Sequence, residues 1–173
     1  MNFNLDEAVE ILERTPQTLE HFLSGLSENW ILSDEGEGTW SVIQIIDHLI
    51  EGEKTNWLPR LEMMVSGENE TFPPFDRFAH LKQDSKGSLE QRFQEYRRIR
   101  EVNILKIKQM INPESHLDLT GVHPAFGQVK VRELLSTWVV HDLTHISQIV
   151  RIMAERYRED VGPWVEYLGI LKK

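Results

Sequence analysis

The sequence predicts an all-α protein built as a four-helix bundle in one domain, residues 1–173. Four long segments carry apolar residues at spacings of three and four, which is the pattern of helices with one buried face. A chain of 173 residues is long enough to bury a substantial core without covalent cross-links. No internal repeat or linker divides the sequence, so we expect a single domain.

The first helix is expected from about Leu5 to Leu26. Pro16 interrupts this segment. Because proline lacks an amide hydrogen and clashes with the preceding turn, we expect a kink or a split there, with Thr15 capping the second half. Residues 33–38 are rich in Ser, Asp, Glu and Gly and predict a polar turn before the second helix.

The second helix is expected to open at Thr39 or Ser41, whose side chains can accept a hydrogen bond from an amide of the first turn. Its first nine residues are apolar on most of the circumference, which predicts a helix inside the bundle. It should continue to about Val65 with a bend at Pro59. Residues 66–87 show no sustained period and predict a long crossover loop, with a short helix around residues 75–82.

The third helix is expected from Ser88, with Gln91 completing a capping box, to about Ile111. Residues 112–128 contain prolines and glycines and predict a second loop. The residues expected to be buried on the third helix are Leu89, Phe93, Tyr96, Ile99, Val102, Ile104, Leu105 and Ile107.

The fourth helix is expected from about Val129 to Arg156. Its buried stripe steps by three or four residues and places two histidines on the core face. Residues 162–171 are expected to pack back on the bundle as a short helical turn. The predicted stripe of the fourth helix is Val131, Leu134, Leu135, Trp138, His141, His145, Ile149 and Ile152.

Charge and composition exclude several classes of function. With 28 acidic and 19 basic residues the net charge is −9, which disfavours binding to nucleic acid or to an anionic membrane surface. Three arginines, Arg97, Arg98 and Arg100, alternate with glutamates, which is typical of a solvated helix face. No segment approaches the roughly 20 apolar residues of a membrane span, and the N-terminus carries early acidic residues, so we expect a cytoplasmic protein.

The histidines of the core stripe point to a metal site. His141 and His145 lie four residues apart on a helix, so their side chains are about 40° apart around its axis and can share one ion. His48 lies within the apolar second helix, where an imidazole without partners would be costly to bury. Because the chain has no cysteine, any metal must use nitrogen and oxygen ligands. These residues predict one divalent ion on three histidines, with an open position for water or substrate.

Other interpretations of these histidines stay open. Buried histidines are often satisfied by a carbonyl or a carboxylate. A metalloprotease is disfavoured because Asp142, and not glutamate, follows His141. A di-iron centre requires paired Glu-x-x-His motifs, and none fits here. A mononuclear site is therefore the better prediction.

Candidate assistants of the site lie one turn from the histidines. Glu51 is a candidate fourth ligand, general base or surface carboxylate, and Asp142 is a candidate to orient a ring or to pair with an arginine. The candidate pocket residues are Gln44, Trp138 and Gln148. We expect the remaining histidines to be exposed, namely His21, His80, His116 and His123. We expect the core and its rim to contain Trp40, Trp57, Trp138 and Trp164.

Short motifs over nearly the whole chain resemble the DinB-like superfamily. The resembling pieces are Arg14-Thr15-Pro16, Thr39-Trp40-Ser41, His48-Leu49, Gly52-Glu53, Trp57, His123-Pro124, Phe126-Gly127 and the run from Trp138 to Gln148. The resemblance implies an up-up-down-down bundle with a three-histidine metal site, which carries over onto His48, His141 and His145. It also implies homodimers and nickel or zinc as the ion.

Relatives in that superfamily include S-transferases that use low-molecular-weight thiols such as bacillithiol, thiol-dependent isomerases and proposed hydrolases. The sequence therefore predicts a metal-dependent transferase or hydrolase that acts on a small-molecule substrate, with a thiol as a possible cofactor. The alternative is a non-catalytic bundle, with a structural ion or none, that serves dimerisation or partner binding.

Overall fold

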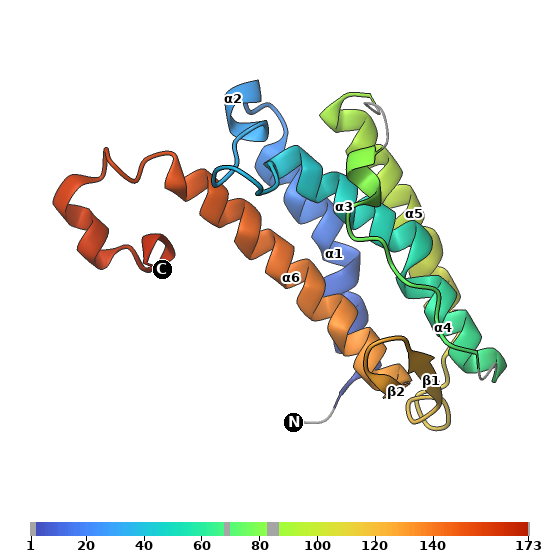
Figure 1. Cartoon of the computed structure of the whole chain (residues 1–173). Coiled ribbons are helices and arrows are strands. Elements are labelled where there is room, and N and C mark those ends of the chain that lie inside the picture. The colour runs from blue at the N-terminus through green and yellow to red at the C-terminus, as the bar shows by residue number, and fades with distance from the viewer. Residues whose placement is uncertain (1–2, 68–69, 83–86, 173) are drawn as a thin grey trace.

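The computed structural model describes residues 3–67, 70–82 and 87–172. Four long helical segments form a bundle (Figure 1), as the hydrophobic spacing predicted. These segments are α1 (Leu5–Leu23), α3 (Val42–Thr55) continued by α4 (Trp57–Ser66), α5 (Leu89–Met110) and α6 (Val131–Glu155). The shorter elements are α2 (Glu28–Ile31), η1 (Ala79–Lys82), β1 (Thr120–His123), β2 (Gly127–Lys130), η2 (Gly162–Tyr167) and η3 (Gly169–Leu171).

The bundle contains two parallel and two antiparallel neighbouring pairs. In Figure 1, α1 and α6 run in one direction, and α3, α4 and α5 run in the other. Both α1 and α3 pack against α5 and α6, so α1 with α6 and α3 with α5 are the parallel pairs. In chain order from α1, the four directions are up, down, down and up. The parallel and antiparallel neighbouring pairs are the same as in an up-up-down-down bundle, which is the arrangement that the family resemblance implies.

The apolar core divides into two clusters. One cluster joins the first half of α1 to α4, the end of α5 and the start of α6, and the other joins the second half of α1 to α3, the start of α5 and the end of α6. Buried polar residues lie between them on three helices, namely Glu53, Arg100, Asn103 and Asp142. None of the described helices has the length and apolar character that crossing a membrane requires.

Of the kink or split predicted at Pro16, the split does not occur. Helix α1 is continuous from Leu5 to Leu23, and the hydroxyl of Thr15 donates to the carbonyl of Ile11 at 3.0 Å instead of capping a second helix. Proline leaves the carbonyl of Leu12 without its helical amide partner. The guanidinium of Arg100 donates to that carbonyl at 2.6 Å. The carbonyl that the proline leaves without an amide partner is therefore satisfied by a side chain from another helix.

The second predicted helix divides at Asn56, three residues before the bend expected at Pro59. Asn56 closes α3 and opens α4, which places Pro59 in the first turn of α4. A proline is tolerated in a first turn because those amides have no helical acceptor. At the other end, Ser41 is the predicted cap of α3, and its amide donates to Oε1 of Gln44 at 2.8 Å.

Helix α5 confirms its predicted start and part of its predicted buried stripe. Ser88 and Gln91 form the expected capping box. Val102 and Leu105, expected to be buried, are exposed, Leu105 by 58%. Arg100, expected on a solvated face, is only 2% exposed. The buried side follows Phe93, Tyr96, Arg100, Asn103, Ile104 and Ile107, which also keeps helical spacing.

The predicted second loop contains a β-hairpin that the sequence analysis missed. Strand β1 pairs antiparallel with β2, with Thr120 opposite Lys130 and His123 opposite Gly127. The amide of Phe72, in the segment after α4, donates to the carbonyl of Val122 at 2.8 Å. Short strands rich in turn-forming residues lack a clear alternating pattern, which is why the segment was interpreted as a loop.

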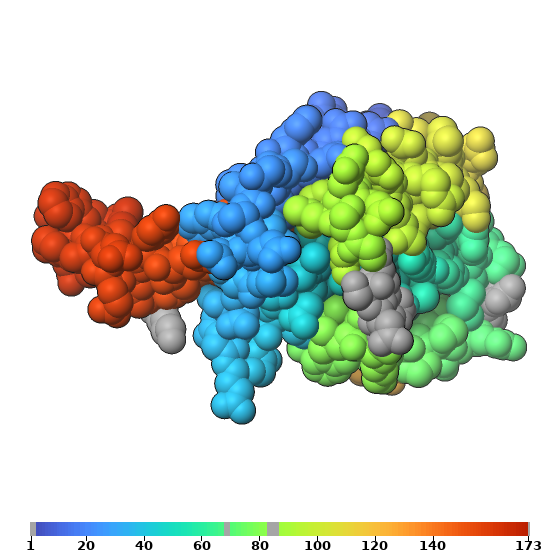
Figure 2. Space-filling model, turned by 90° about the horizontal axis from the view of Figure 1, so that it is seen from above, coloured from blue at the N-terminus to red at the C-terminus, as the bar shows by residue number. Residues whose placement is uncertain are grey.

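The connection between α4 and α5 contains a short 3₁₀ helix, η1, near the predicted short helix. Residues 68–69 and 83–86 of this predicted crossover lie outside the described residues. At the C-terminus the tail projects from the side of the bundle in Figures 1 and 2, and the expected packing of residues 162–171 against the bundle holds for η3 but not for η2. Trp164 and Tyr167 are 68% and 86% exposed, and only η3 folds back on the end of α6.

Candidate metal centre

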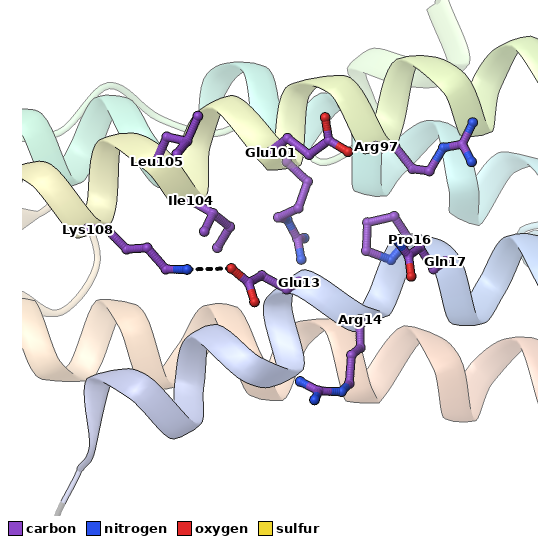
Figure 3. Close-up of a pocket in the computed structure, with 10 residues that line it drawn as sticks. Glu13, Arg14, Pro16, Gln17, Arg97, Glu101, Ile104, Leu105 and Lys108 are labelled. Atoms are coloured by element: carbon purple, nitrogen blue, oxygen red, sulfur yellow. Dashed lines mark hydrogen bonds and ion pairs between the residues drawn. The ribbon is translucent and has the colours of Figure 1, made fainter.

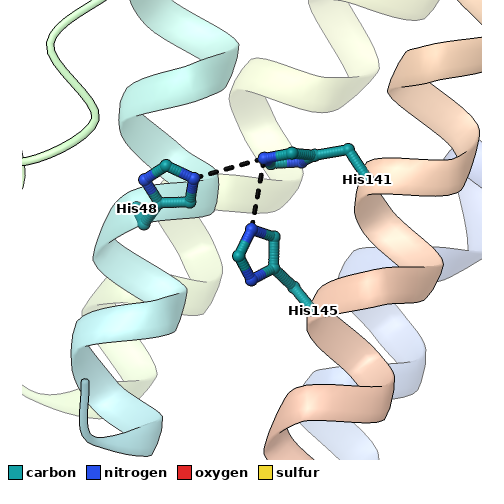
Figure 4. Close-up of side chains that lie close together, drawn as sticks. All are labelled: His48, His141 and His145. Atoms are coloured by element: carbon teal, nitrogen blue, oxygen red, sulfur yellow. Dashed lines mark hydrogen bonds between the residues drawn. The ribbon is translucent and has the colours of Figure 1, made fainter. Parts of the chain in front are cut away.

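The three predicted ligands converge from two helices. His48 lies on α3, and His141 and His145 lie one turn apart on α6, with all three rings directed toward one another (Figure 4). Nε2 of His141 lies 3.2 Å from Nε2 of His48 and 3.2 Å from Nε2 of His145. A ring nitrogen of each histidine lies within 4.8 Å of the other two. The structure therefore brings the predicted residues together, and binding of an ion stays a prediction.

The separations of these nitrogens suit a single metal ion. Two imidazole nitrogens bound tetrahedrally at about 2.0–2.1 Å from one ion lie about 3.3–3.4 Å apart. Both measured separations from His141, at 3.2 Å, are close to that value. Three nitrogens of the same chemical type facing one point form a donor set for a cation.

Burial keeps the histidines in the form that binds metals. Burial and the charge of His145 lower the pKa of His48 and of His141 to about 3. Burial also lowers the pKa of His145, against the opposing effects of Gln148 and Asp142. The three imidazoles are therefore neutral near pH 7, and a metal does not have to displace protons to bind them.

A neighbouring amide orients one of the rings. Nδ1 of His145 lies 2.9 Å from Oε1 of Gln148, so a proton on Nδ1 is donated to the amide oxygen and Nε2 keeps its lone pair. Gln148 is not itself one of the predicted ligands, but it orients the ring of one of them, His145. Nδ1 of His141 is buried and makes no hydrogen bond to a described residue.

A buried ionic network lies directly beside the histidines. Arg100 donates to Asp142 and to Glu53, in both cases at 2.7 Å. Glu53 also accepts from Asn103 at 2.9 Å and from Nε1 of Trp138 at 2.9 Å. Burial raises the pKa of Glu53, and the charge of Arg100 opposes this.

The sequence analysis missed Arg100, Glu53 and Asn103 as members of this network. The signal was present on the third helix, because Arg100 continues the three-and-four spacing of Phe93 and Tyr96. For Asp142, the structure shows pairing with an arginine, one of the two roles expected.

A pocket of about 590 Å³ opens over the histidines. The ring of Trp40 lies 4.7 Å from that of His48 and stacks at 6.3 Å on that of His145, and the ring of Phe75 lies 5.7 Å from that of His48. The pocket is lined by Glu35, Gly38, Thr39, Trp40, His48, Phe75, Arg77, Phe78, His141, His145, Gln148 and Arg151.

The candidate assistants take different places. Gln148 lines the pocket, whereas Gln44 caps α3. Trp138 is fully buried, stacks on Trp57 at 5.6 Å and belongs to the core instead of the pocket wall. Glu51 is half-buried on α3, and its Oε1 accepts a hydrogen bond from Thr55 at 3.2 Å.

His80 was expected to be exposed, and this was wrong. It is 4% exposed, and its ring packs edge-on against Trp40 at 4.7 Å and lies 5.3 Å from the ring of His48. The residues around it are far apart in the sequence, so no local pattern predicted its burial. Trp164, expected at the core or its rim, is instead exposed on the C-terminal tail.

A second cavity, of about 630 Å³, lies between α1 and α5 (Figure 3). Its walls are mainly charged, with Lys108 paired to Glu13 at 2.6 Å, and it reaches the buried Arg100. No histidine is among the residues that line it. The donor set for a metal therefore lies in the pocket over His48, His141 and His145.

Comparison with known proteins agrees with this arrangement. The sequence profile of the DinB superfamily matches residues 11–149, which is more than half of the chain. Among solved structures, the chain is similar to YfiT from Bacillus subtilis, described as a probable metal-dependent hydrolase with an unusual four-helix bundle topology. The TM-score is 0.76 at 16% sequence identity, over 87% of this chain and 86% of that chain, which shows a shared fold. No curated protein matches the sequence. The chain belongs to the DinB superfamily.

Proposed function

We propose that this chain is a metal-dependent enzyme that holds one divalent ion, zinc or nickel, on His48, His141 and His145 and acts on a small molecule. The observation that carries the proposal is the convergence of three imidazole nitrogens in a pocket, with two separations of 3.2 Å. Imidazole nitrogen suits both ions. Membership of the DinB superfamily and the description of YfiT as a probable metal-dependent hydrolase support the proposal.

The residues around the ligands have separate roles. An ion on three histidines lowers the pKa of a bound water or thiol and so supplies a nucleophile near neutral pH. Gln148 holds the ring of His145 in the ligating orientation. Trp40 and Phe75 cover the side of His48 and keep bulk water from it.

Two reactions are within the proposal, hydrolysis and transfer of a low-molecular-weight thiol of the bacillithiol type. Because the chain has no cysteine, a sulfur nucleophile would come from the thiol cofactor. The homodimer that the family resemblance implies belongs to the same proposal. Light scattering coupled to size-exclusion chromatography gives the mass of the assembly and tests it.

The alternative is a non-catalytic bundle with a structural ion or none. A structural ion usually has a closed set of four protein ligands. Glu51 was one candidate for a fourth ligand, and its Oε1 accepts a hydrogen bond from Thr55. Among the described residues, the group placed to hold an ion contains the three histidines only. An open fourth position favours the enzyme.

Elemental analysis of protein purified without a metal-affinity tag tests the metal site. We expect about one transition-metal ion per chain in the wild type and none in His48→Ala. His21→Ala is the matched control, because His21 is an exposed histidine on α1. Absence of metal from the wild type after reconstitution with zinc and with nickel would contradict the proposal.

Comparison of the metal-loaded wild type with His48→Ala tests catalysis. The substrates are an activated ester or amide for hydrolysis, and an electrophile with bacillithiol for thiol transfer. Activity in one assay that is lost in His48→Ala identifies the reaction. A fully loaded protein that is inactive in both assays would favour the non-catalytic alternative.

A further inference from the structure

The residues that line the pocket include more basic than acidic side chains. Among its lining residues, Glu35 is the acidic one, and Arg77 and Arg151 are the basic ones. Arg151 donates to both carboxylate oxygens of Glu35, at 2.6 Å and 2.7 Å. A bidentate pair of this kind neutralises both partners. The charge of Arg77 therefore stays uncompensated among the lining residues.

Arg77 is held at the pocket by aromatic rings. Its guanidinium carbon lies 4.8 Å from the ring centre of Phe78 and 6.0 Å from that of Trp40. The neighbouring carboxylate, Asp76, instead accepts from Lys82 at 2.6 Å and from the amide of Phe78 at 3.0 Å. Within residues 3–67, 70–82 and 87–172, no carboxylate pairs with Arg77. Stacking on rings leaves the edge of a guanidinium, with its N–H groups, open to a ligand.

The rest of the pocket suits an apolar small molecule. Trp40, Phe75 and Phe78 supply aromatic walls, and the volume of about 590 Å³ lies within the range of small-molecule sites. A ligand that fills this space and also carries a negative charge satisfies both the rings and Arg77. The net charge of −9 on the whole chain does not prevent this, since solvent ions screen charges beyond about 8 Å.

We propose that the pocket selects small organic carboxylates with an apolar or aromatic body, and that Arg77 is the specificity-determining residue that binds the carboxylate. The inference rests on the proposed function for the reaction itself, which it locates at the three histidines. The edge of an arginine donates two parallel N–H groups to the two oxygens of a carboxylate. A neutral amide has a single acceptor oxygen and no charge, so it cannot accept this pair of hydrogen bonds. The substrate class is therefore small molecules that carry a free carboxylate in addition to the bond that reacts.

The test compares phenylacetate with its neutral isostere phenylacetamide. Binding of each to the zinc-loaded full chain is followed by NMR titration. We expect phenylacetate to bind at least about tenfold more tightly, and Arg77→Gln to remove this preference by weakening phenylacetate alone. Arg77→Lys should restore part of it, because the charge returns without the bidentate geometry. Arg98→Gln, at an exposed arginine of α5, is the control and should bind both probes as the wild type does.

Equal affinity for the two probes, absence of binding of either probe, or an unchanged preference in Arg77→Gln would each overturn the inference. Zinc content is measured on every sample, and the titration is repeated on the metal-free wild type and its Arg77→Gln variant. An Arg77-dependent preference in protein that binds no zinc would keep the carboxylate site and reject the proposed function. Normal zinc content with no effect of Arg77→Gln would reject the carboxylate site and keep the proposed function.

Discussion

Asp142 accepts two hydrogen bonds from Arg100 inside the bundle, at 2.7 Å from Nη1 and 3.2 Å from Nη2. The same guanidinium donates to Glu53 on α3 and to the carbonyl of Leu12 on α1. Arg100 lies on α5 and Asp142 on α6, so one buried arginine connects all four long helices. Asp142 directly follows His141, and the network therefore also fixes the part of α6 that carries the predicted ligands.

Replacement of Arg100 should destabilise the protein strongly. Arg100→Met leaves Glu53 and Asp142 buried without their cation, and removal of one partner from a buried ion pair costs about 3–5 kcal/mol. Urea unfolding at pH 7 measures the free energy of unfolding. Arg98→Met, on the exposed side of the same helix, should change it by less than about 0.5 kcal/mol. Equal effects of the two substitutions would show that the network contributes no special stability.

The metal-free protein should lose stability as the pH falls below about 6.5. The pKa of His48 and of His141 is about 3 in the folded state, whereas an unfolded histidine has a pKa of about 6.5. Between these values the unfolded chain binds more protons, so this contribution is complete above about pH 6.5 and decreases toward about pH 3. The limiting slope is about 1.4 kcal/mol per pH unit for each histidine.

Urea unfolding between about pH 5 and pH 7, above the titration of ordinary carboxylates, measures this slope. His48→Gln should reduce it, because one titrating group with a lowered pKa is lost. His21→Gln, at an exposed position, should leave it unchanged. A slope that is the same in His48→Gln and the wild type would contradict the assignment to the buried histidines.

Zinc should stabilise the folded state through the three histidines. A ligand at about 100 times its Kd, bound only to the folded chain, adds about 2.7 kcal/mol. For a protein of this size that corresponds to a rise in Tm of roughly 5–11 °C. Differential scanning calorimetry with and without zinc measures the shift. His145→Ala should show little of it, and an equal shift in that variant would place the stabilising ion elsewhere.

The hairpin should be sensitive to a methyl group at Gly121. A Cβ there would lie 2.4 Å from Cζ of Phe72 and 2.7 Å from Cγ of Met64, both buried side chains. Gly121→Ala should therefore lower the free energy of unfolding by about 1–3 kcal/mol through overpacking. Gly169→Ala is the control, because nothing lies within 4 Å of the added Cβ. Chemical denaturation compares the two, and equal stabilities would mean that Phe72 moves aside without cost.

The features that the sequence predicted correctly depend on residues close together in the chain. The spacing of apolar residues located the four helical segments, and Ser88 with Gln91 marked the start of α5 because a capping box is complete within one turn. His141 and His145 were placed on one face of α6 by the helical period alone. The presence of His48 within an apolar helix then indicated a third ligand.

By itself, therefore, the sequence determined the four helical segments, the N-caps of α3 and α5 and the set of candidate ligands. Only the tertiary structure decided the burial of Arg100 and His80, the continuity of α1 at Pro16 and the aromatic pocket with Arg77 at its wall. Periodicity and caps arise from contacts within one or two turns. Whether a charged group is paired, or a proline's orphaned carbonyl finds a donor, depends on residues up to 88 positions away, which meet only when the helices pack.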